Sequence, residues 1–160
     1  MIRLQKAKPR DCLKIWKWRN EPGVRSVSVN NKIIPLETHK IWYSNKIKDP
    51  GVRILIAKNL GNPYGYARIE KTERNCGEIH IAVTKASRGK GLGLLLLQKS
   101  CAHAFIKMRF GEITARIKPE NKRSIGLFKR AGFVPVTSKK TEKKILTFRL
   151  KKAAAKGIEK

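Results

Sequence analysis

A glycine-rich turn between a strand and a long helix is the feature that most constrains the fold of this chain. Residues 88–93 read Arg-Gly-Lys-Gly-Leu-Gly, after the apolar segment 78–84 and before a segment with helical apolar spacing over 91–108. Glycines let a backbone turn tightly and point several N–H groups outward, and a helix N-terminus adds partial positive charge. The turn therefore predicts a cradle for a pyrophosphate, to which Arg88 and Lys90 would add charge.

The turn does not match two well-known nucleotide loops. It lacks the Lys-Ser/Thr pair of a triphosphate-binding loop, and it lacks the strand-first βαβ setting and downstream acid of a dinucleotide fold. Taken alone, it has the alternative interpretation of a tight turn without a ligand. Whether this turn binds a ligand must therefore be judged from the rest of the sequence.

Hydrophobic periodicity predicts one domain over residues 1–151, followed by a basic, flexible tail over 152–160. The expected order βααβββαβαββ indicates an α/β fold with one mixed sheet of about seven strands flanked by about four helices. Gly132 is expected to end the last helix. The expected strands are 2–6, 52–57, 64–70, 78–84, 113–117, 133–136 and 144–150, and the expected helices are 9–20, 35–49, 91–108 and 121–131.

The charge of the chain is extreme for 160 residues. Lys and Arg number 38 and Asp and Glu 11, so the net charge is 38 − 11 = +27. This potential attracts nucleic acid, an anionic membrane surface or phosphorylated small molecules, and a solvated basic surface without a partner is the alternative. Basic residues are densest near the end of the chain, at Lys139, Lys140, Lys143, Lys144, Arg149, Lys151, Lys152, Lys156 and Lys160.

Membrane and metal-binding classes are not favoured. The longest purely apolar run, Leu94–Leu97, is far shorter than a bilayer span, and the N-terminus has no apolar region typical of a secretory signal. Cys12, Cys76 and Cys101 form no CxxC pair and have no His at ligand spacing, so we expect neither a metal site nor a disulfide framework. A reduced, cytoplasmic location is expected.

A second motif, taken together with the glycine-rich turn, indicates a particular protein family. Residues 121–133 read NKRSIGLFKRAGF. The segment SRGKGLG, followed later by N-x-x-S-x-x-L-F-x-x-A-G-F, resembles the GCN5-related N-acetyltransferase (GNAT) superfamily, and the expected element order fits along nearly the whole chain. The resemblance implies an enzyme that moves an acetyl group from acetyl-CoA to a primary amine by direct attack.

The resemblance also implies a cofactor site. The pyrophosphate of acetyl-CoA is expected on the backbone of Arg88, Gly89, Lys90, Gly91, Leu92 and Gly93, and its pantetheine arm beside Ile81, Ala82 and Val83. Asn121 and Ser124 are expected to approach the pantetheine or its ordered water, and Phe128 to lie near the thioester. Many members carry Tyr where this chain has Phe128, and that hydroxyl protonates the leaving thiolate. Water, Ser124 or another hydroxyl takes that role here, or no general acid is needed.

Glu78 and His80 are the candidates for the catalytic base. They lie two apart on one strand and share a face, while Ile79 and Ile81 take the other. The superfamily often uses a Glu on this strand, and histidine is the side chain that titrates closest to neutral pH. The alternatives are a Glu78 that only pairs with a basic side chain and a His80 that is an ordinary strand residue.

The N-terminal third is expected to bind the acceptor. The segment KWRNEPGVRSVSVNNKIIPLETHKIWYSNKI, with Gly-Tyr-Ala-Arg at 65–68, resembles N-acetyltransferases of nucleotide-linked amino sugars, such as that of the pseudaminic acid pathway. It is more loosely similar to ribosomal-type protein N-terminal acetyltransferases and to aminoglycoside acetyltransferases. The resemblance implies that the substrate is bound by Trp18, Arg19, Asn20, His39 and Arg68.

Positive charge favours a phosphorylated acceptor and disfavours polycationic aminoglycosides. Candidate phosphate or base partners are Arg19, Arg25, Arg53 and Arg68. The alternative roles are core packing for Trp18 and helix capping for Arg19 and Asn20. A protein N-terminus as the acceptor, or a basic nucleic-acid-binding module without activity, stays open, as does the choice between monomer and homodimer.

Overall fold

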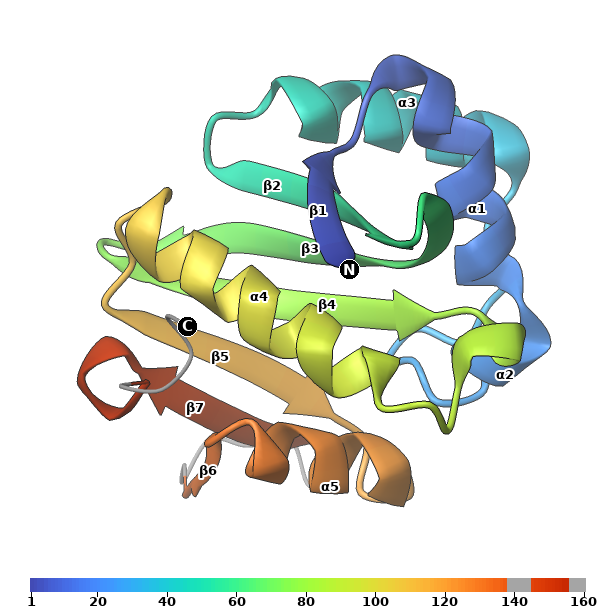
Figure 1. Ribbon diagram of the computed structural model, residues 1–160. Coiled ribbons are helices and arrows are strands. Elements are labelled where there is room, and N and C mark those ends of the chain that lie inside the picture. The colour runs from blue at the N-terminus through green and yellow to red at the C-terminus, as the bar shows by residue number, and fades with distance from the viewer. Residues whose placement is uncertain (138–144, 156–160) are drawn as a thin grey trace.

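A seven-stranded mixed sheet runs through the computed structural model, which describes residues 1–137 and 145–155 (Figure 1). The strand order across the sheet is β1-β2-β3-β4-β5-β7-β6. This confirms the predicted α/β class and the number of strands. The strands are β1 (Ile2–Lys6), β2 (Val52–Asn59), β3 (Asn62–Glu73), β4 (Cys76–Val83), β5 (Glu112–Ile117), β6 (Val134–Val136) and β7 (Leu146–Lys151).

In the part of the chain that the structure describes, five α-helices accompany the sheet, where about four were expected. The additional one starts at Pro22, just after the expected helix 9–20. Proline suits the first position of a helix, because its fixed φ is helical and no N–H is needed there. The helices are α1 (Cys12–Asn20), α2 (Pro22–Arg25), α3 (Leu36–Lys48), α4 (Leu92–Ile106) and α5 (Lys122–Arg130).

The sheet divides between β4 and β5. From β1 to β4 all neighbours are antiparallel, but β4 and β5 are parallel and pair only where Cys76–Glu78 face Glu112–Thr114. Beyond that point β5 pairs only with β7, and Figure 1 shows β4 and β5 diverging. Residues 79–83 of β4 therefore have no strand partner on the β5 side, and we call them the unpaired edge of β4.

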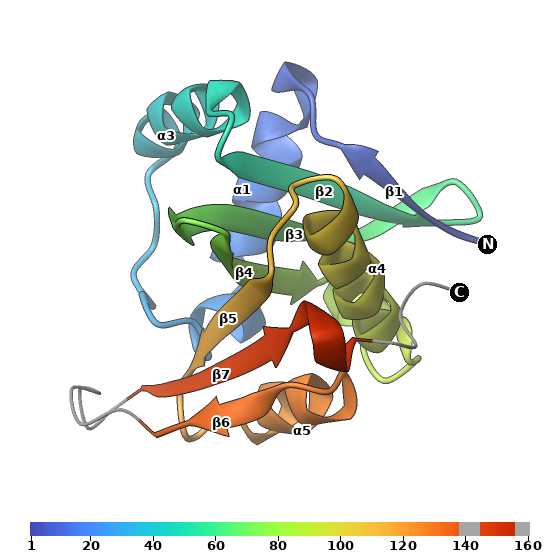
Figure 2. The same cartoon turned by 90° about the vertical axis from the view of Figure 1, so that its left-hand side faces the viewer.

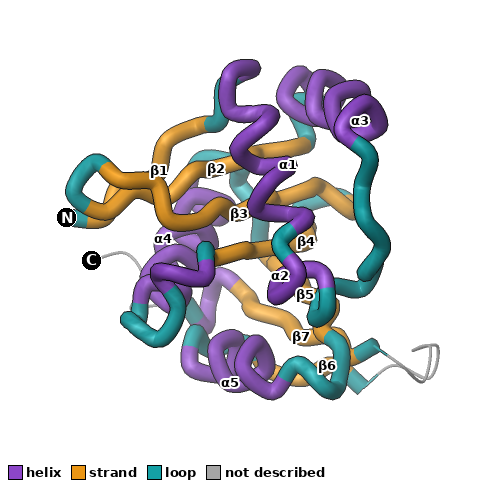
Figure 3. The backbone as a smooth tube through the Cα atoms, turned by 90° about the vertical axis from the view of Figure 1, so that its right-hand side faces the viewer, coloured by secondary structure: helices purple, strands orange, loops and turns teal. Residues whose placement is uncertain are grey.

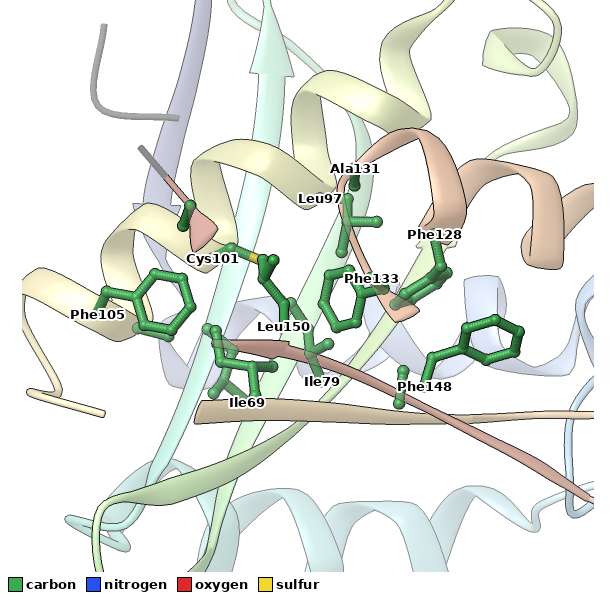
Figure 4. Close-up of a cluster of buried hydrophobic side chains, with 14 of the residues drawn as sticks. Ile69, Ile79, Leu97, Cys101, Phe105, Phe128, Ala131, Phe133, Phe148 and Leu150 are labelled. Carbon is green, nitrogen blue, oxygen red and sulfur yellow. The ribbon is translucent and has the colours of Figure 1, made fainter. Parts of the chain in front are cut away.

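One face of the sheet packs on α4 and α5. Leu97, Cys101 and Phe105 recur at helical spacing on α4 and meet Ile69 and Ile79 from β3 and β4 (Figure 4). All five side chains are at most 3% exposed, so α4 is fixed firmly across the sheet. Gly132 ends α5 with a φ of +91°, as predicted.

The opposite face of the sheet packs on α1 and α3 (Figure 2). Ile15 of α1 and Tyr43 of α3 are buried against Ile54 and Tyr66 of the sheet. Side chains alternate across a strand, so one face of β4 joins the α4 core while Glu78 and His80 face α1 and α3. One face of β4 therefore belongs to the apolar core against α4, and the other presents the polar side chains of Glu78 and His80.

The C-terminal segment is packed as far as the structure describes it. Lys152–Ala154 form a 3-10 turn after β7, and Ala155 is 7% exposed within the core. The flexible tail expected from residue 152 is therefore ordered through residue 155. Six of the clustered basic residues lie outside the described residues: Lys139, Lys140, Lys143, Lys144, Lys156 and Lys160. Within the described ranges, every helix is too short or too polar to cross a membrane.

Candidate active site

The glycine-rich turn lies where β4 ends and α4 begins. Gly89 and Gly91 have φ values of +77° and +74°, in the left-handed region that strains any residue with a side chain. A Cβ added at either residue would have no heavy atom within 4 Å. Conformation, and not crowding, therefore requires glycine at these two positions.

Free backbone donors surround this turn. The amides of Gly89, Lys90 and Gly91 donate to no acceptor among the described residues. Gly91 is the N-cap of α4, whose first turn contributes further N–H groups without an intrahelical acceptor. Such amides, at the positive end of a helix dipole, form a site for a phosphate or pyrophosphate group.

Arg88 does not add its charge to the turn, contrary to the prediction. Its Nε donates to the carbonyl of Val83 at 3.1 Å, and its Nη2 lies 2.6 Å from Oε1 of Glu21. The guanidinium therefore joins the turn to the start of α2, which Figure 3 places beside the end of β4. Lys90 is exposed and forms no ion pair within the described ranges, so it can still meet a phosphate.

The unpaired edge of β4 contains the segment expected to bind pantetheine. The side chains of Ile81 and Val83 pack toward α4, and Ala82 is 8% exposed on the other face. On its β5 side, the strand presents the backbone groups of these residues and not their side chains. An extended chain of amides can pair with such an edge as another strand would.

The second motif has mainly structural contacts. The Oδ1 of Asn121 accepts a hydrogen bond from the amide of Ser124 at 3.1 Å and so caps α5. Phe128 is 3% exposed, with its ring 4.9 Å from Phe133 in an edge-on arrangement (Figure 4). Phe128 is therefore part of the core, and its position beside a thioester stays a prediction. Asn121 keeps its NH₂ group for a ligand.

Glu78 and His80 form a bonded pair on the face toward α1 and α3. The Nε2 of His80 lies 2.9 Å from Oε1 of Glu78. The Nε of Arg116, on β5, lies 3.1 Å and 3.2 Å from the two carboxylate oxygens. A carboxylate only accepts, so in the neutral ring of His80 this arrangement puts the proton on Nε2 and leaves the lone pair on Nδ1.

These contacts separate the roles of the two candidate bases. Burial acts to raise the pKa of Glu78, but the hydrogen bonds and charges of His80 and Arg116 outweigh it and lower this pKa to about 2. A carboxylate that holds a proton so weakly is a poor base near neutral pH. The geometry favours His80 as the base and Glu78 as the residue that orients it.

The low pKa of Glu78 predicts a loss of stability in acid. The unfolded value is near 4.5 and the folded value about 2, so the stabilisation is complete above pH 5 and is lost as pH falls toward 2. Lowering the pH from 6 to 3 should reduce the free energy of unfolding of both the wild type and Glu78→Gln. We expect this reduction to be about 2 kcal/mol larger in the wild type. Urea denaturation at both pH values measures this.

The control for this prediction is Glu37→Gln. Glu37 is 78% exposed in its ion pair with Lys40, so its replacement should leave the pH dependence close to that of the wild type. Parallel curves for Glu78→Gln and the wild type would contradict the assignment of a strongly paired Glu78.

Aromatic and guanidinium groups adjoin His80 on the same face. Trp18 stacks on Tyr66 with ring centroids 6.3 Å apart. Arg68 is the register partner of His80 on β3, and its guanidinium carbon lies 5.2 Å from the ring centroid of Trp42. The structure thus brings together three predicted residues, Trp18, Arg68 and His80.

Arg19 is held close to this group. Its Nη2 donates to the carbonyl of Asn30 at 2.6 Å, while its buried Nη1 has no partner among the described residues. Burial lowers the pKa of Arg19, and the neighbouring charges of Arg68 and Arg25 lower it further. A guanidinium with a free buried N–H next to another arginine is a favourable position for an anion.

Asn20 and His39 have structural roles that differ from the predicted substrate contacts. The side chain of Asn20 bonds both the N–H and the carbonyl of Ile34, each at 2.9 Å, and so fixes the loop before α3. His39 is 2% exposed and its Nε2 lies 3.1 Å from the carbonyl of Cys12. Burial lowers the pKa of His39, which therefore links α3 to α1 as a neutral ring.

Three residues of the site were not predicted from the sequence. Arg116 pairs with Glu78, Glu21 pairs with Arg88, and Tyr66 stacks on Trp18. Arg116 could have been found from the sequence, because Glu112, Thr114 and Arg116 alternate with apolar residues and mark a polar face of β5. The other two pairings join segments far apart in the chain.

The cysteines do not form an acyl-carrying site. Burial raises the pKa of Cys12, of Cys76 and of Cys101, which keeps these thiols protonated and weakly nucleophilic. In the described ranges, three or more His, Cys, Asp or Glu side chains never converge as they would around a metal ion.

Diverging parallel strands beside a cradle of free amides define an α/β protein built to hold an extended, pyrophosphate-bearing cofactor. The family model described as acetyltransferase (GNAT) domain matches residues 2–134, and the chain belongs to this family. It is therefore an N-acetyltransferase of the GNAT type. This confirms the superfamily and the type of enzyme expected from the sequence, and solved structures with the same fold hold CoA or acetyl-CoA, the expected cofactor.

Solved structures share the fold at low sequence identity. The spermidine N-acetyltransferase from Vibrio cholerae, with CoA and spermine, has a TM-score of 0.85 at 15% identity, covering 96% of this chain and 97% of its own. The aminoglycoside acetyltransferase AAC(6')-Ib with coenzyme A has a TM-score of 0.83 at 19% identity, covering 98% of both chains. The yncA protein from Salmonella typhimurium, with acetyl-CoA, has a TM-score of 0.77 at 24% identity, covering 94% of both. Among curated proteins, none matches at a significant level.

Proposed function

We propose that this acetyltransferase acts on a primary amine whose molecule also carries phosphate, with a nucleotide-linked amino sugar as the best example. The observation that carries the proposal is the pair of arginines, Arg19 and Arg68, beside the aromatic rings that adjoin His80. Guanidinium groups bind phosphate oxygens, and the exposed parts of Trp18 and Trp42 can stack on a base.

The carboxylates near the site argue against a polycationic acceptor. Glu21 lies 2.6 Å from Nη2 of Arg88, and Oε1 of Glu70 lies 2.6 Å from Nε of Arg68. Glu70 also accepts from Lys46, and Glu78 is held by His80 and Arg116. With each carboxylate already neutralised by a cation, little negative charge is left for a polyamine or aminoglycoside, although two proteins of similar structure are named for such acceptors.

The unpartnered Nη1 of Arg19 supports an anionic acceptor. A buried N–H donor without an acceptor costs free energy, and a phosphate oxygen would satisfy it. Arg68, although paired with Glu70, is close enough to lower the pKa of Arg19, so a phosphate there would meet two guanidinium groups. The loop over residues 26–35 covers this region, held by Arg19, Asn20 and Arg25.

The proposed reaction is a direct transfer. The amine nitrogen forms a bond to the acetyl carbon, the bond from that carbon to sulfur breaks, and the proton lost by the amine passes to Nδ1 of His80. A backbone N–H on the unpaired edge of β4 would stabilise the developing oxyanion. Coenzyme A can leave as a thiolate, since free thiols have pKa values near ~8.5, and this suits a site where Phe128 provides no hydroxyl.

The test is the release of free thiol from acetyl-CoA with four acceptors in parallel. These are a UDP-linked 4-amino-6-deoxy sugar, the same sugar without UDP, spermidine, and N-terminal peptides of ribosomal proteins. We expect kcat/KM to be highest with the UDP-linked sugar, and Arg19→Gln to lower it by about 10–100-fold for that acceptor alone.

Lys17→Gln is the matched control, because Lys17 is an exposed cation on the same helix. Equal rates with and without UDP, or a preference for spermidine, would overturn the phosphorylated acceptor. A preference for the peptides would assign the enzyme to protein N-terminal acetylation.

A further inference from the structure

We propose that the protein has a second anion-binding site, separate from the acetyl-transfer site, that binds a run of phosphate groups. The site is an open cleft of about 650 Å³. Its lining has five basic residues and no acidic one: Arg53, Lys71, Arg74, Lys107 and Arg109. We call it the basic cleft.

The basic cleft lies at the far end of the sheet from the cofactor turn. Arg53 is at the start of β2, Arg74 is in the β3–β4 turn, and Lys107 and Arg109 follow α4. The glycine-rich turn is at the opposite ends of both β4 and α4 (Figure 1). Since α4 has 15 residues, the two sites are roughly 22 Å apart along the helix.

The five cations are uncompensated. Within residues 1–137 and 145–155, none of them forms an ion pair or a side-chain hydrogen bond. The neighbouring acid Glu70 is already held by Lys46 and Arg68, and Glu112 lies 3.9 Å from Arg149. Asp49 and Glu70 line the adjoining pocket, which shares Lys71, but the wall of the basic cleft gathers like charges and therefore attracts anions.

Two further observations come from α4 and the turn that follows it. Arg109 has a φ of +58°, in the left-handed region where glycine would be less strained, yet the position carries an arginine that lines the cleft. The buried Nε2 of His103 has no partner among the described residues. Burial lowers the pKa of His103, and the charges of Arg53 and Lys107, which line the cleft, lower it further.

Phosphate groups are the anions that fit this cleft. Several adjacent phosphates can meet cations that come from three separate segments, whereas a single carboxylate can meet only one or two. Such phosphates come from a strand of nucleic acid or from a free nucleoside triphosphate. The net charge of +27 would strengthen the long-range attraction of either.

The test compares two triple variants of equal charge. The cleft variant combines Arg74→Gln, Lys107→Gln and Arg109→Gly, of which the last relieves a left-handed arginine. The control combines Arg3→Gln, Lys58→Gln and Lys129→Gln, at β1, at the far end of β2 and on α5. Binding of a fluorescent single-stranded 20-nucleotide RNA is measured by anisotropy across a salt series, and ATP binding by calorimetry.

We expect the cleft variant alone to lose RNA affinity by at least tenfold. Its slope of log K against log salt should become shallower by about two, because each phosphate contact on a single strand contributes about 0.7. Loss of ATP binding in the cleft variant, with no RNA binding by the wild type, would support the site with a nucleotide as its ligand. Equal losses in both variants, or no binding of RNA or ATP by the wild type, would overturn the proposal. Thermal unfolding and acetyl-CoA turnover, expected to be unchanged, verify that the cleft variant is folded.

Discussion

His80→Gln is expected to lower kcat for acetyl transfer by about 100–1000-fold while the affinity for acetyl-CoA stays unchanged. The amine must lose a proton as it attacks, and Nδ1 of His80 carries the lone pair because Glu78 holds the ring through Nε2. Glutamine keeps a similar size and a hydrogen bond to Glu78 but cannot accept the proton. Steady-state thiol release gives kcat, and calorimetry gives the affinity for acetyl-CoA.

The companion variant Glu78→Gln should have a smaller effect, about tenfold on kcat, because the ring then loses the carboxylate that orients it but keeps its lone pair. A normal kcat in His80→Gln together with a large loss in Glu78→Gln would transfer the role of base to Glu78 or to a water molecule held by it. Similar kcat values in all three proteins would remove both residues from the chemistry.

Gly91→Glu is expected to weaken acetyl-CoA binding by at least about 100-fold. Gly91 has a φ of +74°, so any side chain strains the turn, and a carboxylate there repels a pyrophosphate at the N-terminus of α4. No heavy atom lies within 4 Å of an added Cβ, so the protein without cofactor can accommodate the side chain. Calorimetric titration with acetyl-CoA measures the change.

Gly61→Glu is a closely matched control. Gly61 has a φ of +84° in the β2–β3 turn and the same empty surroundings, so strain and charge change by similar amounts. Unchanged binding in this variant, with similar thermal unfolding of both proteins, would attribute the loss to the cradle. If Gly91→Glu bound acetyl-CoA as the wild type does, the pyrophosphate would have to be bound elsewhere.

Hydrophobic periodicity predicted the helices and strands well, because the spacing of apolar residues shows which face of each element is buried. The apolar positions of α4 recur at helical spacing, and those of β4 alternate, so both elements were placed within a few residues. The same reasoning is less successful for α3, because not every apolar residue of that helix is buried. Ile41 is 68% exposed, and His39 and Tyr43 are the buried residues instead, since α1 offers a carbonyl to His39 and the carbonyl of Lys8 accepts from Tyr43.

The glycine-rich turn could be predicted from its sequence because the groups expected to bind a pyrophosphate are backbone amides and not side chains. Side-chain roles depend on partners that a local pattern does not reveal. Arg88 was expected at the pyrophosphate, but its partner Glu21 lies 67 residues away in the chain. Asn121 looked like a cofactor ligand, and it also has the local role of a helix cap. Whether a polar side chain is already bonded within the fold decides whether it can bind a substrate.

The ion pair between Arg88 and Glu21 has a consequence for the order of events in turnover. It connects the turn expected to bind the donor to the junction of α1 and α2, next to the loop expected to cover the acceptor. A shift of either segment on binding would change this contact and so affect the other segment. Thermodynamic reciprocity requires that, if the donor changes the affinity for the acceptor by some factor, the acceptor changes the affinity for the donor by the same factor.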